Sequence, residues 1–136
     1  MTLERAAVPV SAEDSRGAMV RAELCGPPVM HRHDPGEVYF VQHGEFAFYA
    51  EDPGGSVRRW TAGAGAVVPL AGGTPHTIRN ESGADAVAFV VYAPGAPMEG
   101  FMRAAAALAA GGNPEMDAVL AIAAQHGIEL LGPVPA

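Results

Sequence analysis

Short apolar runs, separated by glycine, proline and aspartate, dominate the first two thirds of the sequence. In several runs apolar and polar residues alternate, and a period of two is typical of β-strands. Turn signals such as Asp34-Pro35-Gly36 and the segment 52–56 stand between the runs. Many short strands at close intervals predict an all-β barrel or sandwich. The predicted strands are 18–24, 29–33, 37–42, 45–50, 57–61, 66–70, 76–80 and 86–93.

Two aromatic-rich runs in the middle of this series are separated by only a short connection. Strand 37–42 is followed by His43-Gly44, and strand 45–50 begins directly afterwards. Glycine in a short connection allows the positive φ that tight β-hairpins require. We therefore expect these two strands to pair with each other as a hairpin.

The pattern changes after Pro94-Gly95. The segment 99–110 is rich in alanine and contains neither proline nor any glycine apart from Gly100, which predicts a helix. Asn113-Pro114 combines an N-cap residue with a proline in the first turn, and this predicts a second helix. That helix is expected to run to about His126, before Gly127.

A chain of 136 residues is most simply one domain with one hydrophobic core. The barrel is expected to occupy residues 1–98, and a two-helix extension is expected to occupy residues 99–136. Residues 128–131 form a last strand or extended segment within the extension. We expect the extension to cover the barrel or a dimer partner.

Composition and charge narrow the class of protein. Hydrophobic residues make up 49% of the chain and charged residues 17%, which is typical of a globular protein. The net charge of −7, with eight basic residues, argues against nucleic acid as a partner. No apolar run is long enough to span a membrane, residues 1–10 lack the pattern of a signal peptide, and Cys25 has no second cysteine to pair with. We expect a soluble, cytoplasmic protein.

Three histidines and one glutamate are the candidate metal ligands, and two of the histidines lie two residues apart. His31 and His33 share one face of an extended strand, because side chains alternate along it. Glu37 follows four residues later, and His76 would have to reach the same place from a distant strand. Only a closed or sandwiched sheet allows that arrangement.

Imidazoles and a carboxylate suit a divalent transition metal, namely Fe, Mn, Ni, Co, Cu or Zn. Four protein ligands leave two positions of an octahedral ion open for water, dioxygen or a chelating substrate. A structural zinc site is commonly rich in cysteine, and this chain has one. The alternative interpretation is that the histidine pair is merely solvated and Glu37 is a surface charge.

Aromatic residues flank the candidate ligands on two predicted strands. Most of them are expected to pack in the core, but alternation turns one set inward, where it can line an apolar pocket. Gln42 is expected either to contact a substrate or ligand or to face solvent. Arg58, Arg59 and Arg79 are interpreted as surface charges, since no phosphate-binding context surrounds them. The candidate pocket residues are Tyr39, Gln42, Phe46, Phe48 and Ile78.

These residues occur in an order that resembles the cupin superfamily, and the resemblance covers residues 18–93. It implies a single jelly-roll barrel, also called a double-stranded β-helix, with the candidate metal ligands inside. Six residues separate Pro69 from His76, a longer interval than usual, and Gly26 stands one residue closer to His31 than usual. The first motif is present as Gly26, His31, His33, Glu37 and Gly44, and the second as Gly63, Pro69, Gly73, His76 and Asn80.

The C-terminal part resembles small bacterial monocupins that are grouped as quercetin-dioxygenase-like. The matching segments are 93–95, 99–101 and 127–133. The resemblance implies a metal-dependent dioxygenase that acts on an enolisable or aromatic small molecule, with Glu37 as a ligand and a catalytic proton acceptor. It also implies a homodimer. Two alternatives remain: an oxygen-independent Lewis-acid isomerase, cyclase or decarboxylase of a polyketide-like or keto-acid substrate, and a non-enzymatic metal- or ligand-binding cupin.

Overall fold

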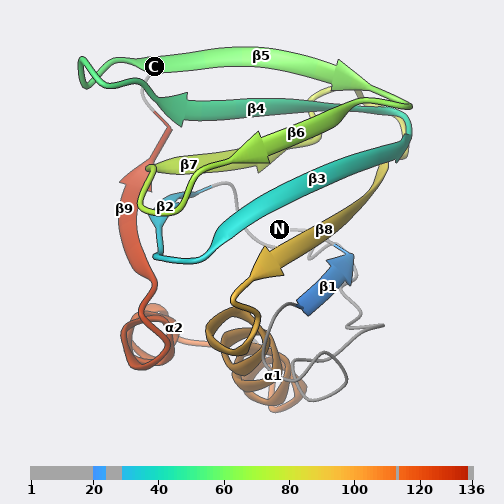
Figure 1. The fold of residues 1–136 in the computed structure, drawn as a ribbon. Helices are drawn as coiled ribbons and strands as arrows, with labels where there is room; N and C mark the ends of the chain where they lie inside the picture. The colour runs from blue at the N-terminus through green and yellow to red at the C-terminus, as the bar shows by residue number, and fades with distance from the viewer. Residues whose placement is uncertain (1–19, 24–28, 113, 135–136) are drawn as a thin grey trace.

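Two antiparallel β-sheets face each other, and two helices lie at one end (Figure 1). The computed structural model describes residues 20–23, 29–112 and 114–134. One sheet has four strands in the order β1-β8-β3-β6, and the other has five in the order β5-β4-β7-β2-β9. The elements are β1 (Val20–Glu23), β2 (Val29–Arg32), β3 (Gly36–His43), β4 (Glu45–Glu51), β5 (Val57–Gly63), β6 (Val67–Leu70), β7 (His76–Arg79), β8 (Val87–Ala93), α1 (Ala96–Ala110), α2 (Met116–Gln125) and β9 (Glu129–Pro133).

The mainly β jelly-roll barrel predicted from the sequence is confirmed, and most strands begin and end within two residues of the predicted positions. The first strand is described only over Val20–Glu23, so the rest of its predicted range lies outside the described residues. The same holds for Cys25, Gly26 and Asn113.

The predicted hairpin between β3 and β4 is wrong. β3 pairs with β6 and β8 in one sheet, whereas β4 pairs with β5 and β7 in the other. Gly44 has the positive φ of +70° that the sequence suggested, but the chain uses it to cross between the sheets. A Cβ atom at Gly44 would lie 2.4 Å from the carbonyl oxygen of Asp85, so the close approach of that loop also requires glycine. A local turn signal such as Gly44 therefore does not determine the pairing partner of a strand.

The hydrophobic core lies between the two sheets and continues under the helices. Alternate residues of β3 and β8 face this interior, as the period of two requires. Phe46 and Phe48 of β4 also face it, whereas the buried Ala47 and Tyr49 between and beside them pack with Met30 in a second, smaller cluster. Met98 of α1, Ala123 of α2 and Ile128 join the same cluster, so both helices pack against the barrel. The buried residues of the barrel in this cluster are Tyr39, Val41, Phe46, Phe48, Val68, Leu70, Ala88, Val90 and Tyr92.

The C-terminal elements differ in detail from the prediction. α1 begins at Ala96, three residues earlier than expected, because Pro97 is well suited to the first turn of a helix. α2 ends at Gln125, and Gly127 follows with φ of +73°, as its left-handed stop predicts. The last segment is a strand, β9, which pairs with β2 and lies at the edge of the five-stranded sheet. Neither helix in the described part of the chain has the length and apolar character needed to cross a membrane.

Candidate metal centre

The structure brings the candidate ligands together from both sheets. His31 lies on β2 and is the register partner of His76, the first residue of β7, in the five-stranded sheet. His33 follows β2 directly, where the chain leaves this sheet. Glu37 lies on β3 of the four-stranded sheet and is buried in the interior. Residues that are far apart in the sequence therefore converge between the sheets.

The three histidine rings surround one small space. A set of side-chain nitrogen atoms, one from each of His31, His33 and His76, lies within 4.8 Å of one another. The ring centroids are 4.5 Å apart for His31 and His76, 5.1 Å for His33 and His76, and 5.7 Å for His31 and His33. The Glu37 carboxylate contacts Nε2 of His76, and its Oε2 lies 3.8 Å from Nε2 of His33.

Each imidazole is held by the main chain through its other nitrogen. Nδ1 of His31 donates to the carbonyl oxygen of Val29 at 2.8 Å, and Nδ1 of His33 donates to that of Pro35 at 2.8 Å. Nδ1 of His76 donates to the carbonyl oxygen of Thr74 at 2.7 Å. A carbonyl oxygen only accepts, so Nδ1 carries a hydrogen in all three rings, and in the neutral form of each ring the Nε2 lone pair is left for another partner. This orientation by hydrogen bonds to Nδ1 is typical of metal-binding histidines.

Nε2 of His76 and the Glu37 carboxylate contact each other as an ion pair, but beyond that contact four buried polar atoms at this centre have no hydrogen-bond partner: Nε2 of His33, Nε2 of His76 and both carboxylate oxygens of Glu37. A buried polar group without a partner costs about 1–3 kcal/mol, and more when it is charged. Proteins keep such groups where a ligand completes them. A divalent transition metal fits this donor set, because it would bind neutral imidazole nitrogens and an ionised carboxylate.

The pKa values reflect burial and the pairing of Glu37 with His76. Burial, assisted by the charge of His76, lowers the pKa of His31 to about 4. Burial also lowers the pKa of His33. For His76 the effect of burial is outweighed by contact with Glu37, which raises the pKa. The pKa of Glu37 is lowered although burial opposes this, because His76 and the other histidines stabilise the carboxylate.

Two tyrosines lie beside Glu37 in the interior. Tyr92 is its register partner on β8, and its ring centroid lies 6.0 Å from that of His33. Tyr39 is two residues along β3 from Glu37 and packs edge-on against Phe48, with 5.3 Å between centroids. Burial, followed by the negative charge of Glu37, raises the pKa of both phenols well above their usual range. Both side chains are therefore neutral hydroxyls next to the carboxylate.

The five candidate pocket residues differ in their burial, and one of them is exposed to solvent. Tyr39, Phe46 and Phe48 are buried in the core cluster, and the half-buried Ile78 packs against that cluster. Gln42 is exposed, at a bulge between Val41 and His43 of β3. The structure therefore does not bring Gln42 to the candidate ligands. A substrate pocket formed by this group stays a prediction.

Sequence reasoning missed two aromatic residues near the centre, Tyr92 and Trp60. The alternation of Ala88, Val90 and Tyr92 along β8 was the signal that turns Tyr92 inward. Trp60 is the register partner of Phe48, and their rings stack with centroids 5.6 Å apart.

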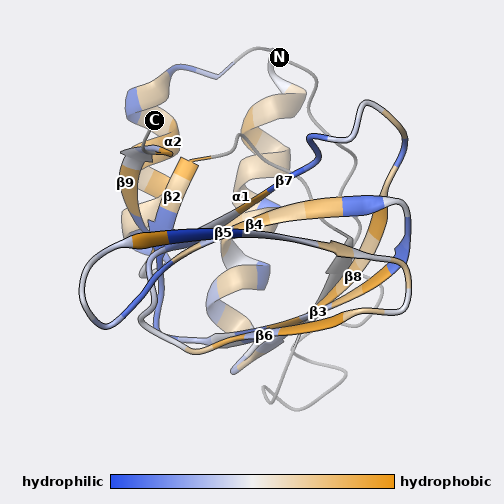
Figure 2. Cartoon of the chain, turned by 90° about the horizontal axis from the view of Figure 1, so that it is seen from above, coloured by the Kyte–Doolittle hydropathy of each residue, from blue (hydrophilic) through white to orange (hydrophobic). Residues whose placement is uncertain are grey.

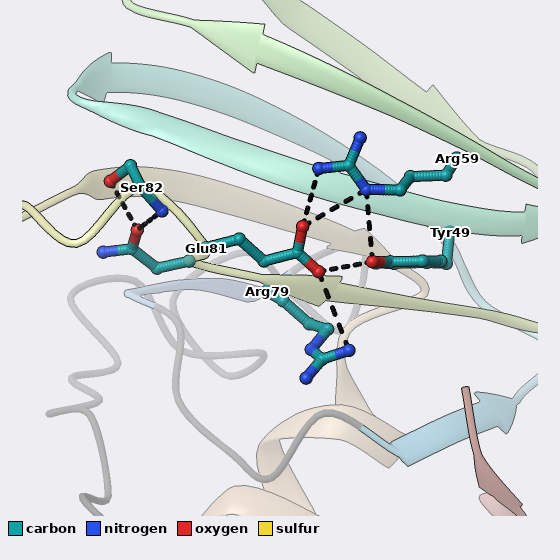
Figure 3. Close-up of polar contacts among 6 residues, drawn as sticks. Tyr49, Arg59, Arg79, Glu81 and Ser82 are labelled. Atoms are coloured by element: carbon teal, nitrogen blue, oxygen red, sulfur yellow. Dashed lines mark hydrogen bonds and ion pairs between the residues drawn. The ribbon is translucent and has the colours of Figure 1, made fainter. Parts of the chain in front are cut away.

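A second polar cluster, formed by Tyr49, Arg59, Arg79 and Glu81, lies on the outer face of the five-stranded sheet (Figure 3). The Tyr49 hydroxyl donates to Glu81, and Arg59 donates to the same carboxylate at 2.6 and 3.2 Å. Nη1 of Arg79 lies 3.6 Å from Oε1 of Glu81. The Tyr49 hydrogen bond and the guanidinium of Arg59 hold the pKa of Glu81 below its usual value. We call these four residues the outer cluster. Its groups satisfy one another, so it calls for no ligand.

The sequence matches a protein-family model described as "Cupin domain" over residues 25–92, half of the chain. This chain is a cupin. The matched region contains all of the candidate ligands, and the cupin superfamily expected from the sequence motifs is thus confirmed. No curated protein matches this cupin.

Solved structures with the same fold include two enzymes. The polyketide cyclase RemF from Streptomyces resistomycificus is 20% identical, with a TM-score of 0.54 over 65% of this chain. A mutant of the oxalate decarboxylase OxdC from Bacillus subtilis is 14% identical, with a TM-score of 0.59 over 99% of this chain. This cupin spans 63% of the length of the cyclase chain and 41% of the decarboxylase chain. At these identities the likeness concerns the fold.

Proposed function

We propose that this cupin is a metal-dependent enzyme that acts on a small molecule, with one divalent transition metal held by the three histidines and Glu37. The observation that carries the proposal is the set of four orphaned buried atoms on His33, Glu37 and His76, which converge where the rings are already oriented by the main chain. When bound, such a metal lowers the pKa of an acidic group that coordinates it and offers open positions to substrate.

The reaction we propose is a dioxygenase-type oxidation of an enolisable or aromatic substrate. Glu37 is the proton acceptor, because its lowered pKa keeps it ionised and its ion-pair partner is an imidazole, which is itself a candidate metal ligand. The neutral hydroxyls of Tyr39 and Tyr92 lie on the same side and can donate hydrogen bonds to a substrate oxygen or to Glu37. The closely packed aromatic residues around them keep water away from the reacting groups.

A second candidate is an oxygen-independent Lewis-acid reaction on a polyketide-like or keto-acid substrate. It is favoured by the similar structures, one a polyketide cyclase and the other an oxalate decarboxylase. The two candidates use the same ligands and differ in their need for dioxygen. Turnover of an enolisable probe such as acetylacetone, or of quercetin, should therefore be measured in air and under strict anoxia. Turnover that persists without oxygen contradicts the dioxygenase and supports the second candidate.

Elemental analysis of protein purified without added metal tests the centre itself. His31→Ala and His76→Ala should each abolish the stoichiometric metal of the unmodified protein. His43→Ala is the matched control, because His43 is exposed at the end of β3 and should leave the metal content unchanged. Retention of metal in both ligand variants overturns the proposal. A metal that is present but has no exchangeable position supports the non-enzymatic alternative.

The homodimer expected from the sequence stays a prediction. Phe40 and Val67 are register partners on β3 and β6, and they are 41% and 57% exposed. Two-fold pairing is the commonest closed assembly. Light scattering at micromolar concentration should give twice the mass of one chain, and a monomeric mass contradicts the prediction.

A further inference from the structure

One row of residues crosses the inner face of the five-stranded sheet and ends at an arginine. Arg58 of β5 is the register partner of Ala50 on β4, and Ala50 is also the partner of His76 on β7. His76 in turn is the partner of His31 on β2. Directly opposite residues of antiparallel strands point to the same face. Arg58 therefore faces the same side as the candidate ligands, whereas its neighbour Arg59 belongs to the outer cluster.

The next row supplies an aromatic wall beside this arginine. Trp60, Phe48 and Ile78 are register partners across β5, β4 and β7. The Arg58 guanidinium lies 5.8 Å from the centroid of the Trp60 ring, and Trp60 stacks on Phe48 with an interplanar angle of 18°. Phe48 contacts Tyr39, which lies beside Glu37. A column of aromatic contacts thus leads from the centre to the guanidinium.

Arg58 also differs from the other arginines in its charge partners. Within residues 29–112 and 114–134, Arg32, Arg59, Arg79 and Arg103 each form an ion pair with a glutamate. Arg58 forms none with a described residue, and its contact is the Trp60 ring. Arg58 is exposed and lies on β5, an edge strand of its sheet, whose hydrophilic segment is blue in Figure 2. Its positive charge is therefore free to bind an anion.

We propose that Arg58 is a specificity-determining residue, which binds an anionic group of a small organic acid whose other end occupies the metal centre. This inference rests on the proposed function of that centre. Two strand spacings, about 10 Å, separate the backbone of Arg58 from that of His76, a span that an arginine side chain and a small molecule bridge together. Only the methyl group of Ala50 stands between them on this row. Trp60 covers the apolar part of the same molecule.

The test compares two chelating probes that differ in one group. 2-Oxoglutarate and 2-oxopentanoate share a five-carbon chain and an α-keto acid, but only the first has a second carboxylate. Cobalt-substituted protein is titrated with each probe under anoxia, and binding is read from the cobalt absorption and the fluorescence of Trp60, the only tryptophan of the chain. Arg58→Gln is compared with Arg59→Gln, which removes the same charge from the opposite face.

The unmodified protein should bind 2-oxoglutarate at least about tenfold more tightly than 2-oxopentanoate, as expected for a charge-assisted hydrogen bond. Arg58→Gln should remove this preference, and Arg59→Gln should retain it. Equal affinity of the two probes in the unmodified protein, absence of binding, or an equal loss in both variants overturns the role of Arg58. Failure to bind cobalt stoichiometrically is a different result, because it contradicts the metal centre itself.

Discussion

The two faces of the five-stranded sheet differ in whether their polar groups make hydrogen bonds. On the outer face, Glu81 is contacted by Tyr49, Arg59 and Arg79, so that its charge and hydrogen-bonding capacity are used. On the inner face, His76 and the facing Glu37 leave nitrogen and oxygen atoms buried without a hydrogen bond. Strand β7 contributes to both arrangements, with His76 on the inner face and Arg79 on the outer face. The difference teaches that a site is marked less by the number of its polar groups than by buried polar atoms whose hydrogen bonds are not made.

The largest effect is expected from the aromatic packing that supports the inner face. Phe48 is fully buried between Tyr39 and Trp60. Phe48→Ala should lower the free energy of unfolding by about 3–5 kcal/mol, because it leaves a cavity. Urea denaturation measures this. Phe40→Ala is the matched control, since Phe40 is 41% exposed, and it should cost less than half as much. Equal losses of unfolding free energy in the two variants contradict the contrast between the buried Phe48 and the exposed Phe40.

Replacing one carboxylate on each face tests the comparison directly. Glu37→Gln removes the charge from the candidate ligands and should weaken metal affinity by more than about 100-fold, beyond the usual effect of changing a residue that only supports a ligand. Glu81→Gln changes the same group in the outer cluster and should leave metal affinity unaltered. Competition with a chromophoric chelator gives both affinities. If both variants lose metal to the same extent, the two faces are not functionally distinct.

Acidification should release metal from the inner face. The pKa of His76 is raised above 6.5 by Glu37, so a proton occupies this ring at a pH where an ordinary histidine is neutral. Below that raised pKa a proton competes with the metal, and affinity should fall about tenfold per pH unit. His31 adds no competition until the pH approaches its pKa of about 4. Calorimetry in two buffers of different ionisation enthalpy, on either side of pH 6.5, should detect the released proton. Zinc binding without proton release contradicts this assignment.

The smallest effect is expected on the outer face. Tyr49→Phe removes the hydroxyl that donates to Glu81 and should lower the free energy of unfolding by about 0.5–1.5 kcal/mol. The metal content should stay that of the unmodified protein. A loss of metal in this variant would show that the outer cluster supports the centre through the sheet.

Most of the strands could be predicted from the sequence, because apolar alternation and turn residues are local signals. The pairing of strands could not. His43-Gly44 carries the composition of a hairpin, yet β3 and β4 belong to different sheets. Pairing is decided by contacts between residues that are distant in the sequence, such as Glu37 with Tyr92 and with Leu70.

The same division between local signals and strand pairing applies to the candidate ligands. The spacing of His31 and His33 placed two rings on one face, and the order of the cupin motifs brought in Glu37 and His76. The role of Arg58 was not visible, because two adjacent arginines in a sequence look alike. Only the register of β5 against β4 separates Arg58, on the row of His76, from Arg59, on the row of Tyr49.

The hydrogen bonds of the three imidazoles all end on carbonyl oxygens within two residues of each ring. The orientation of each ring is therefore fixed by main-chain atoms within two residues of it rather than by distant side chains. None of these three hydrogen bonds depends on a side chain that lines the interior. A scaffold of this kind is open to new reactions, because the residues around the three rings can change while the orientation of the rings is retained.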